Sequence, residues 1–451
     1  MATILGANTL SSGYDVANSC RFATNTYLAK TASSGNQRTF TVSFWAKRSM
    51  KATGHHHYPI SFYQNANNRI SFAFLSGNSF IIYAESGGSG QLTMQTNDLY
   101  RDPNAWVHVV IAFDTTQGTD SNRLKLYING IQITSFADIT YPSQNADLII
   151  NTNIYIGIYD TSNNPFHGYL AEFVYIDGLQ LDQTSFGEFD SDSPAIWKPK
   201  DPSGLTFGTN GFYLDFETSD TLGNDANGGT DFSNNNLTAL DQSTDTCTNN
   251  FAIMNPFNKG GDITVSEGNL KVSNGNSDNS ILGSIGLGNG KWYWEAKCTG
   301  QTTYANIGIT LASADGTIHS TVDAGRIVYS HNGYVYKEGL SGQSNVSGLA
   351  TFTTNDIISV AYDGENGSVK FYKGGVLINT TTDSDLVFSH SSDNEYIPSI
   401  GINQGGFELN FGSPIYSISS GNADANGYGN FEYAVPSGYF ALCTKNLAEY
   451  G

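Results

Sequence analysis

Three carboxylates spaced two residues apart are the part of the chain that best fits catalytic chemistry. Glu188, Asp190 and Asp192 alternate with other residues, so a β-strand would direct all three side chains to one face. Two such groups can hydrolyse a glycosidic bond, one as the acid and the other as the base or nucleophile. Ser193-Pro194 follows at once, and proline interrupts a strand because it lacks the amide hydrogen. We therefore predict no catalytic residue and no enzyme activity.

Two other clusters could bind ligands, and each has a plainer explanation. His55-His56-His57 could bind a transition metal, but adjacent side chains of one chain point in different directions. Lys47, Arg48 and Lys51 could attract an acidic glycan. We favour an exposed polar loop for the histidines and a solvated strand end for the basic residues.

Metal and redox chemistry have little support in the sequence. Asp220, Asp225 and Asp231 carry oxygens suited to calcium, but no glutamate closes the segment as in an EF-hand. We expect no cofactor and no metal site, with calcium left open. The cysteines are dispersed, without Cys-x-x-Cys or histidines at metal-ligand spacing, which favours buried free thiols over a disulfide scaffold. They are Cys20, Cys247, Cys298 and Cys443.

Charge and hydropathy exclude several classes of partner. The chain carries 41 acidic and 21 basic residues, a formal charge of −20. Binding to nucleic acid or to an anionic membrane needs clustered Lys and Arg, so neither is an expected partner. The first residues lack a basic segment followed by a long apolar run, and we expect no leader, no membrane insertion and folding in a cytoplasm.

The elements that position these residues are predicted to be β-strands. In 356–378, apolar and polar residues alternate on either side of a turn, and Gly374-Gly375 suits a two-residue hairpin. The same order of parts occurs at 106–133, with Asn129-Gly130 at the hairpin. A chain of 451 residues suits two cores rather than one. We predict an all-β chain of two antiparallel jelly-roll sandwiches in tandem.

The predicted domains are 1–200 and 259–451, joined by an acidic linker rich in Asn and Gly at 201–258. Residues 201–250 contain eight acidic residues and no Lys or Arg. Low hydrophobicity makes a separate core impossible there. We expect the linker to be solvated and extended by self-repulsion unless it packs along a domain.

Motifs in the first half resemble the laminin-G, concanavalin A-like jelly roll, whose members mostly bind sugar or protein. They are FTVSFWAKRS (40–49), WVHVVIAFD (106–114), LYINGIQI (126–133) and FHGYLAEFVYIDGLQL (166–181). The segment 18–49 is similar to the start of virion structural proteins of tailed bacteriophages, and the segments 186–217 and 201–258 resemble further parts of them.

Jelly-roll glucanases use a row of acids similar to the one at Glu188. Their pattern needs a glutamate as acid/base at the third position, where this chain has the shorter Asp192. This departure argues against catalysis.

The second half resembles a SPRY (B30.2-type) domain. The matching blocks are KWYWEAK (291–297), IGIT (307–310), ISVAYDGENGSVKFYKGG (358–375), YIPSIGI (396–402) and LNFG (409–412), and GYFALCTKNL (438–447) matches the tail of phage versions. SPRY domains bind a peptide or protein through loops at one end of the sandwich. The candidate ligand-binding residues here are Tyr329, Tyr334, Tyr336, His319 and His331. The alternative is that the rings fill the sandwich.

Taken together, the residues and resemblances predict a non-enzymatic bacteriophage virion protein. It would be a tail-fibre, tip or capsid-surface appendage that binds host-surface glycan or protein through loops, as a homo-oligomer beside other virion proteins. The alternatives are a structural decoration or connector protein and, third, a polysaccharide-degrading hydrolase. The chain lacks heptads and collagen-like repeats, which favours a tip or capsid position over a fibre shaft.

Overall fold

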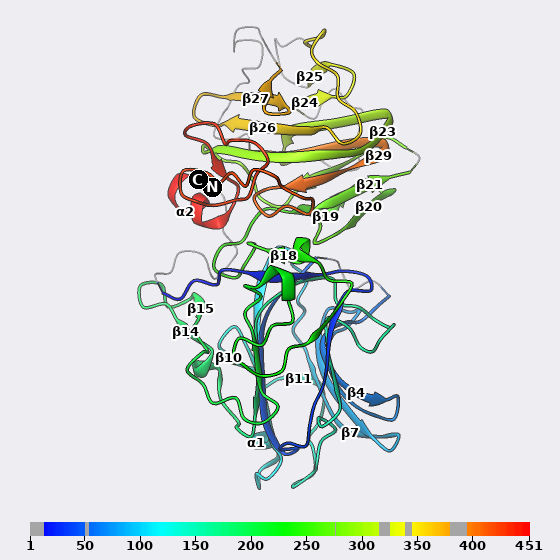
Figure 1. Ribbon diagram of the computed structural model, residues 1–451, viewed down its shortest axis with the longest axis vertical. Coiled ribbons are helices and arrows are strands. Elements are labelled where there is room, and N and C mark those ends of the chain that lie inside the picture. Colours follow the sequence, from blue (N-terminus) through cyan, green and yellow to red (C-terminus); the bar gives the residue numbers. More distant parts are fainter. Residues whose placement is uncertain (1–12, 50–53, 276, 315–324, 339–344, 379–394) are drawn as a thin grey trace. The chain divides into compact units, whose positions relative to one another are not determined.

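The computed structural model describes residues 13–49, 54–275, 277–314, 325–338, 345–378 and 395–451. It divides into two compact units, a first unit that ends at Thr248 and a second unit that begins at Asn249. Nearly all of the regular structure is β-strand (Figure 1). The prediction of an all-β chain with two sandwiches in tandem is confirmed.

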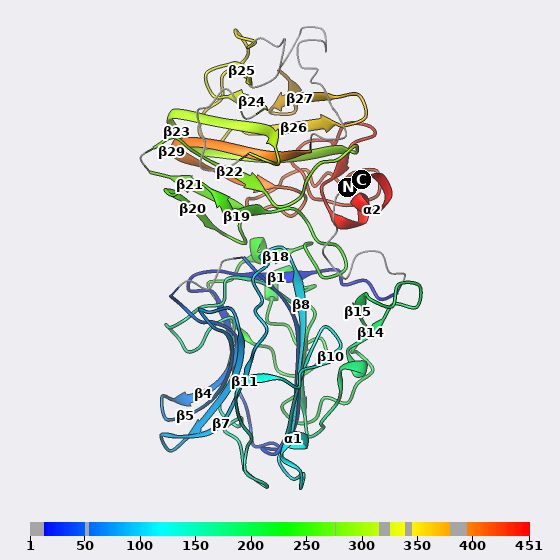
Figure 2. The ribbon, with the colours of Figure 1, turned by 180° about the vertical axis from the view of Figure 1, so that it is seen from behind.

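The first unit is a sandwich of two facing antiparallel sheets (Figure 2). In the described residues, one sheet has the order β10-β9-β8-β3-β13-β1-β18, with β16 also on β13. Its strands are β1 (Ser19–Phe22), β3 (Thr39–Arg48), β8 (Trp106–Asp114), β9 (Leu124–Ile128), β10 (Ile131–Gln132), β13 (Gly168–Asp177), β16 (Phe212–Leu214) and β18 (Gln242–Ser243).

The facing sheet has the order β11-β7-β6-β5-β4-β12-β2-β17. Its strands are β2 (Tyr27–Thr31), β4 (His57–Asn65), β5 (Asn68–Phe74), β6 (Phe80–Ser86), β7 (Ser89–Thr96), β11 (Phe136–Thr140), β12 (Asn153–Ile156) and β17 (Ser233–Asn235). Alternate residues of both sheets meet in one core of aliphatic and aromatic side chains, where Phe40 stacks on Phe113 at 4.3 Å. The small elements outside the sheets are α1 (Asp120–Arg123), η1 (Gln183–Ser185), β14 (Gly187–Phe189), β15 (Trp197–Pro199), η2 (Ser219–Thr221) and η3 (Ala239–Asp241).

The second unit is built around two long neighbouring strands, β23 (Lys291–Leu311) and β29 (Tyr396–Asn410). The first part of β23 pairs with β26 and its last part with β24. The other elements are β19 (Met254–Lys259), β20 (Ile263–Ser266), β21 (Lys271–Asn274), β22 (Asn279–Gly283), β24 (Arg326–Ser330), β25 (Tyr334–Glu338), β26 (Ile357–Asp363), β27 (Ser368–Lys373), β28 (Val376–Leu377), β30 (Phe440–Ala441) and α2 (Thr444–Tyr450).

The start of β23 follows the predicted alternation on its core face. Trp292, Trp294, Ala296 and Cys298 all lie in the core. On the other face, Glu295 is also buried, because the segment after β29 covers it. Its carboxylate accepts the backbone N–H groups of Glu432 and Tyr433 and the Tyr293 hydroxyl, each at 2.9 Å.

The predicted linker at 201–258 differs from what the structure contains. Its residues up to Thr248 belong to the first unit, where they supply β16, β17 and β18. β18 pairs with β1 and β17 with β2, so this segment extends both sheets. The domain boundary therefore lies between Thr248 and Asn249 rather than at 200 and 259.

Ion pairs explain how so acidic a segment packs against the sandwich. Asp241 pairs with Arg21 at 3.1 Å, Asp225 with Lys30 at 3.7 Å and Asp245 with Lys47 at 2.7 Å. The basic partners all come from the first three strands. Lys47 and Arg48 are therefore buried, contrary to the solvated strand end predicted from the sequence. Lys51 lies outside the described residues.

We predict that Asp245→Ala destabilises the first unit by about 3–5 kcal/mol, because it removes the carboxylate that pairs with the buried Lys47 ammonium at 2.7 Å. Asp245 also accepts the Trp106 Nε1–H at 3.1 Å. The matched control is Asp147→Ala, which removes the exposed pair with Arg38 and should cost about 1 kcal/mol or less. Urea unfolding of both variants measures the difference. Equal costs would show that Asp245 does not hold the acidic segment to the sandwich.

Candidate functional site

The β24–β25 hairpin of the second unit carries most of the predicted ligand-binding residues (Figure 1). Its turn, 331–333, closes with a hydrogen bond from Gly333 N to Ser330 O at 3.0 Å. Gly333 has a φ of +80°, and a Cβ there would meet the Leu349 carbonyl oxygen at 2.4 Å. Only glycine fits this turn without strain. The geometry of the turn then sets the face of the hairpin on which Tyr334 and Tyr336 lie.

The three predicted tyrosines lie on opposite faces of the hairpin. Tyr329 is fully buried, with its ring 5.2 Å from that of Phe352 and its hydroxyl donating to the Ala350 carbonyl. Burial raises its pKa above the usual value. Tyr334 is 40% exposed, and its ring stacks on that of Tyr336 at 5.6 Å. Tyr334 and Tyr336 remain candidates for ligand contact, whereas Tyr329 fills the core.

The two predicted histidines contribute less. His331 lies in the turn, partly buried, with its ring 6.4 Å from that of Phe352. Burial lowers its pKa, so the ring is neutral at pH 7. His319 lies outside the described residues.

Polar groups that the sequence analysis did not single out lie beside the stacked tyrosines. The strand registers place Gly401, Asn306, Ser330 and Tyr334 in one row across four strands. Asn306 is 1% exposed, and neither its Oδ1 nor its Nδ2 has a hydrogen-bond partner among the described residues. The Ser330 hydroxyl is also buried without a partner in the described part of the chain. Buried groups of this kind cost free energy unless something bonds to them.

A hollow of about 20 Å³ opens on this face of the sheet. Its volume suits one water-sized group, so a ligand would place a single hydroxyl or amide there. The hollow is lined by Ser280, Leu282, Tyr304, Asn306, Thr310, Ala314, Arg326, Val328, Ser399, Ile400 and Gly401. Asn306 and Ser330 escaped the sequence analysis because a polar residue on the outer face of a strand is ordinary. Only the burial of their polar atoms marks them.

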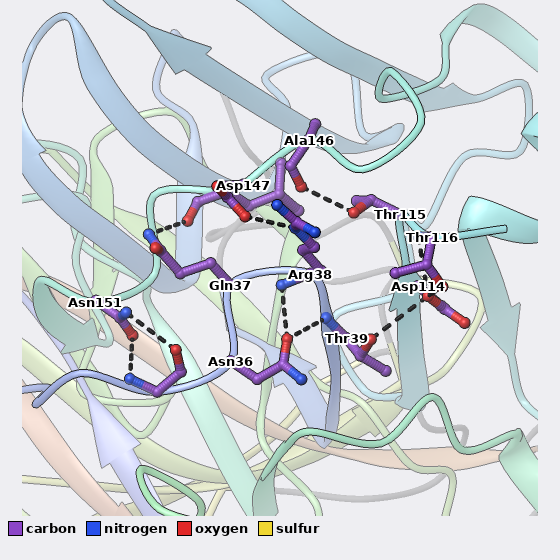
Figure 3. A network of polar contacts seen from close by, with 12 residues as sticks. Asn36, Gln37, Arg38, Thr39, Asp114, Thr115, Thr116, Ala146, Asp147 and Asn151 are labelled. Carbon is purple, nitrogen blue, oxygen red and sulfur yellow. Dashed lines mark hydrogen bonds and ion pairs between the residues drawn. The ribbon is translucent and has the colours of Figure 1, made fainter.

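The polar network around Arg38 in the first unit satisfies its own groups, as Figure 3 shows. The Asn36 side-chain Oδ1 accepts the N–H groups of Arg38 and Thr39 at 2.8 and 3.0 Å. The Arg38 guanidinium donates to Asp147 at 2.7 Å, and the Thr115 hydroxyl to the Ala146 carbonyl at 2.8 Å. The unpartnered Asn306 amide contrasts with this pattern.

The row of carboxylates at Glu188 does not continue along one strand. β14 ends at Phe189, and Asp190 accepts the N–H groups of Asp192 and Ser193 in a turn, both at 2.9 Å. These bonds and the Lys198 ammonium, 3.3 Å away, hold the pKa of Asp190 below its usual value. Glu188 lies 3.5 Å from the same ammonium. A carboxyl held ionised is unsuited to act as a general acid.

The metal-binding candidates are dispersed as well. In the described part of the chain, no three His, Cys, Asp or Glu side chains form a group that could hold a metal ion. His57 is buried, contrary to the predicted exposed loop, and burial lowers its pKa to about 3. Asp225 accepts the Tyr213 and Asn227 N–H groups, Asp231 accepts the Asp225 N–H, and Asp220 is exposed on η2.

The cysteines agree with the prediction made for them. All four cysteines are buried free thiols, as predicted. Within the described ranges, no helix has the length and hydropathy needed to span a membrane.

The fold defines a class of protein made of two sandwich domains, and family comparisons name them. Residues 22–180 match the concanavalin A-like lectin/glucanase superfamily, and residues 291–414 match the SPRY domain. The chain therefore has a concanavalin A-like N-terminal domain and a SPRY C-terminal domain, as the resemblances indicated.

Solved structures show similarity to each part. The SPRY domain of human HERC1 is 17% identical, with 35% of this chain and 96% of that chain covered and a TM-score of 0.27. A heptameric SAP-like pentraxin from Limulus polyphemus is 16% identical, with 38% and 80% covered and a TM-score of 0.28. The TRIM65 PSpry domain is 10% identical, with 35% and 88% covered and a TM-score of 0.28. Curated proteins gave no match.

We predict that Tyr329→Ala destabilises the second unit by about 3–5 kcal/mol, because it removes a large buried ring. Tyr334→Ala should change stability by about 0.5 kcal/mol or less, since its side chain is partly in solvent. Chemical denaturation of both variants tests the assignment. A large loss in Tyr334→Ala would mean that this ring supports the fold and is not free to contact a ligand.

Proposed function

We propose that the chain is a non-enzymatic surface protein of a bacteriophage virion that binds host-surface glycan or protein. It would be a tail-fibre tip or capsid-surface appendage, made in the host cytoplasm and assembled on the particle with other virion proteins. The similarity of residues 18–49 and 201–258 to phage structural proteins supports the virion assignment. Two domains of families rich in binding modules support the binding role.

The observation that carries the binding role is the arrangement around Tyr334. The stacked rings of Tyr334 and Tyr336 present an apolar surface, and the unpartnered amide of Asn306 lies in the same part of the sheet. An aromatic surface beside a hydrogen-bond donor and acceptor suits a sugar ring or a peptide backbone. We call this the tyrosine face.

Weak binding at one such face becomes useful when several copies act together. The hollow beside the tyrosine face accommodates only a small group, which limits the affinity of a single site. A homo-oligomer on the particle would engage several host ligands at once and gain affinity by effective concentration. We therefore propose that the chain acts as an oligomer.

The double variant Tyr334→Ala/Tyr336→Ala should lower binding to host cells by about tenfold or more, the usual effect of removing aromatic contacts from an interface centre. The assay measures labelled protein on whole cells and on a glycan array. Tyr63→Ala is the matched control, a partly exposed tyrosine of the first unit. Binding that survives in the double variant would remove the tyrosine face as the site. Absence of binding by the unaltered protein would remove the adhesion proposal itself.

A structural role, as a decoration or connector protein, is the second candidate. β28 is a short strand with Val376 69% and Leu377 38% exposed. Exposed aliphatic residues on such a strand suit pairing with another protein.

If β28 binds another virion protein, Val376→Lys/Leu377→Lys should reduce incorporation of the chain into particles several-fold without unfolding it. Quantitative blotting of purified particles measures incorporation, and host-cell binding of the free variant provides the control. Normal incorporation would argue against β28 as a contact. Particles that lack the chain, attach normally and fail to assemble would favour the structural role over adhesion.

A further inference from the structure

The first unit contains a cavity of about 370 Å³ at one end of its sandwich. The ends of β3 and β5, the start of β8 and the segment before β8 line it. Most of its wall is apolar, including Phe74, Leu99 and Val107. The volume lies in the range of small-molecule binding sites.

Arg48 lines this cavity and has no acidic partner among the described residues. Its side chain is 5% exposed, and its guanidinium lies 4.9 Å from the centre of the Phe74 ring. Nη2 makes a long contact of 3.4 Å to Asn78 Oδ1, and no described residue forms a hydrogen bond with Nη1. Burying a cation without a counter-charge costs free energy. An anionic ligand bound here would supply the missing partner of Arg48.

The groups around Arg48 do not neutralise it. Burial lowers the pKa of Arg48 to about 10, so the guanidinium is charged at neutral pH. Nearby His57 is neutral, because burial lowers its pKa to about 3. Arg101 and Asp102 also line the cavity, and both are exposed. The cavity therefore keeps a net positive charge in a chain whose formal charge is −20.

Tyr100 gives the cavity a second polar group. Its hydroxyl is buried near the Thr96 side chain, and it makes no hydrogen bond of good geometry with any described residue. Its backbone N–H donates to the Asn78 carbonyl at 2.8 Å, and Asn78 is also the residue that touches Arg48. A ligand with only a hydrocarbon body and a carboxylate would form no hydrogen bond with the Tyr100 hydroxyl. A ligand that also carries hydroxyl groups would bond to both Arg48 and Tyr100.

We propose that this cavity binds the carboxylate of an acidic sugar, with the carboxylate accepting hydrogen bonds from Arg48. The planar guanidinium matches a carboxylate in shape and charge. The C–H faces of the sugar ring would pack on Phe74, Leu99 and Val107, and a ring hydroxyl would bond to Tyr100. This site lies in the first unit and is independent of the tyrosine face.

The test compares D-glucuronate with D-glucose, which has the same ring and no charge. Isothermal titration calorimetry on the full chain should show that glucuronate binds at least about tenfold more tightly than glucose. The reason is that only glucuronate can form a charged hydrogen bond with Arg48. A glucuronate-containing polysaccharide, hyaluronan, forms a second arm. Binding of free glucuronate indicates a small-molecule site, and binding of hyaluronan alone indicates a site for one residue within a chain.

Arg48→Met should abolish the preference for the charged sugar without lowering the melting temperature, because it removes an unpaired buried charge. Arg48→Lys should keep a weakened preference, since a single ammonium cannot form two parallel bonds. Arg38→Gln, which alters an exposed arginine paired with Asp147 before β3, is the matched control and should bind normally. Equally tight binding of glucuronate and glucose, failure of the unaltered chain to bind either glucuronate or hyaluronan, or full binding by Arg48→Met would overturn the proposal. Changes at Tyr334 and Tyr336 should leave glucuronate binding unchanged, which separates this result from the adhesion assay.

Discussion

The first unit depends on ion pairs that join its two ends in sequence. Carboxylates of Asp225, Asp241 and Asp245, from a segment without a single Lys or Arg, meet basic side chains of the first three strands. Lys47 and Asp245 are the extreme case, with side chains 0% and 2% exposed and atoms 2.7 Å apart. Such a pair gives little net stability over an apolar contact, but loss of either partner is expensive. Its main effect is therefore to specify where the acidic segment must lie.

This placement has a consequence for both sheets of the sandwich. β17 and β18 come from the acidic segment, and each adds to the strand at one end of a sheet, β2 and β1 respectively. A bare strand edge would offer unpaired N–H and C=O groups to other chains. In a protein proposed to be present in many copies on a particle, covering these edges limits pairing between copies. The segment that looks most like a linker in the sequence therefore completes the domain.

How far the sequence predicts the structure depends on the range of the interactions. Local alternation predicts the hairpin 356–378, which forms β26, β27 and β28, with φ values of +59° and +75° at Gly374 and Gly375. Local patterns fail for the acidic segment, because its partners lie about 200 residues earlier in the chain. They fail also for Tyr329 and Tyr334, since the turn between them decides which face each occupies. Asn306 is recognisable only from burial and missing partners, and the sequence pattern places Arg48 in a basic cluster without indicating that its side chain is buried.

The unpartnered groups gain significance from the charge balance of the whole chain. Acidic residues outnumber basic ones by 41 to 21, so carboxylates are plentiful. Arg21, Lys30 and Lys47 each pair with one, yet Arg48, the residue next to Lys47, has no acidic partner in the described ranges. The packing around Arg48 therefore leaves a cavity beside this residue where an acid could have been placed. An anionic solute that enters this space would form with Arg48 the ion pair that the described chain does not form. The electrostatic free energy of that pair would favour anionic over neutral solutes.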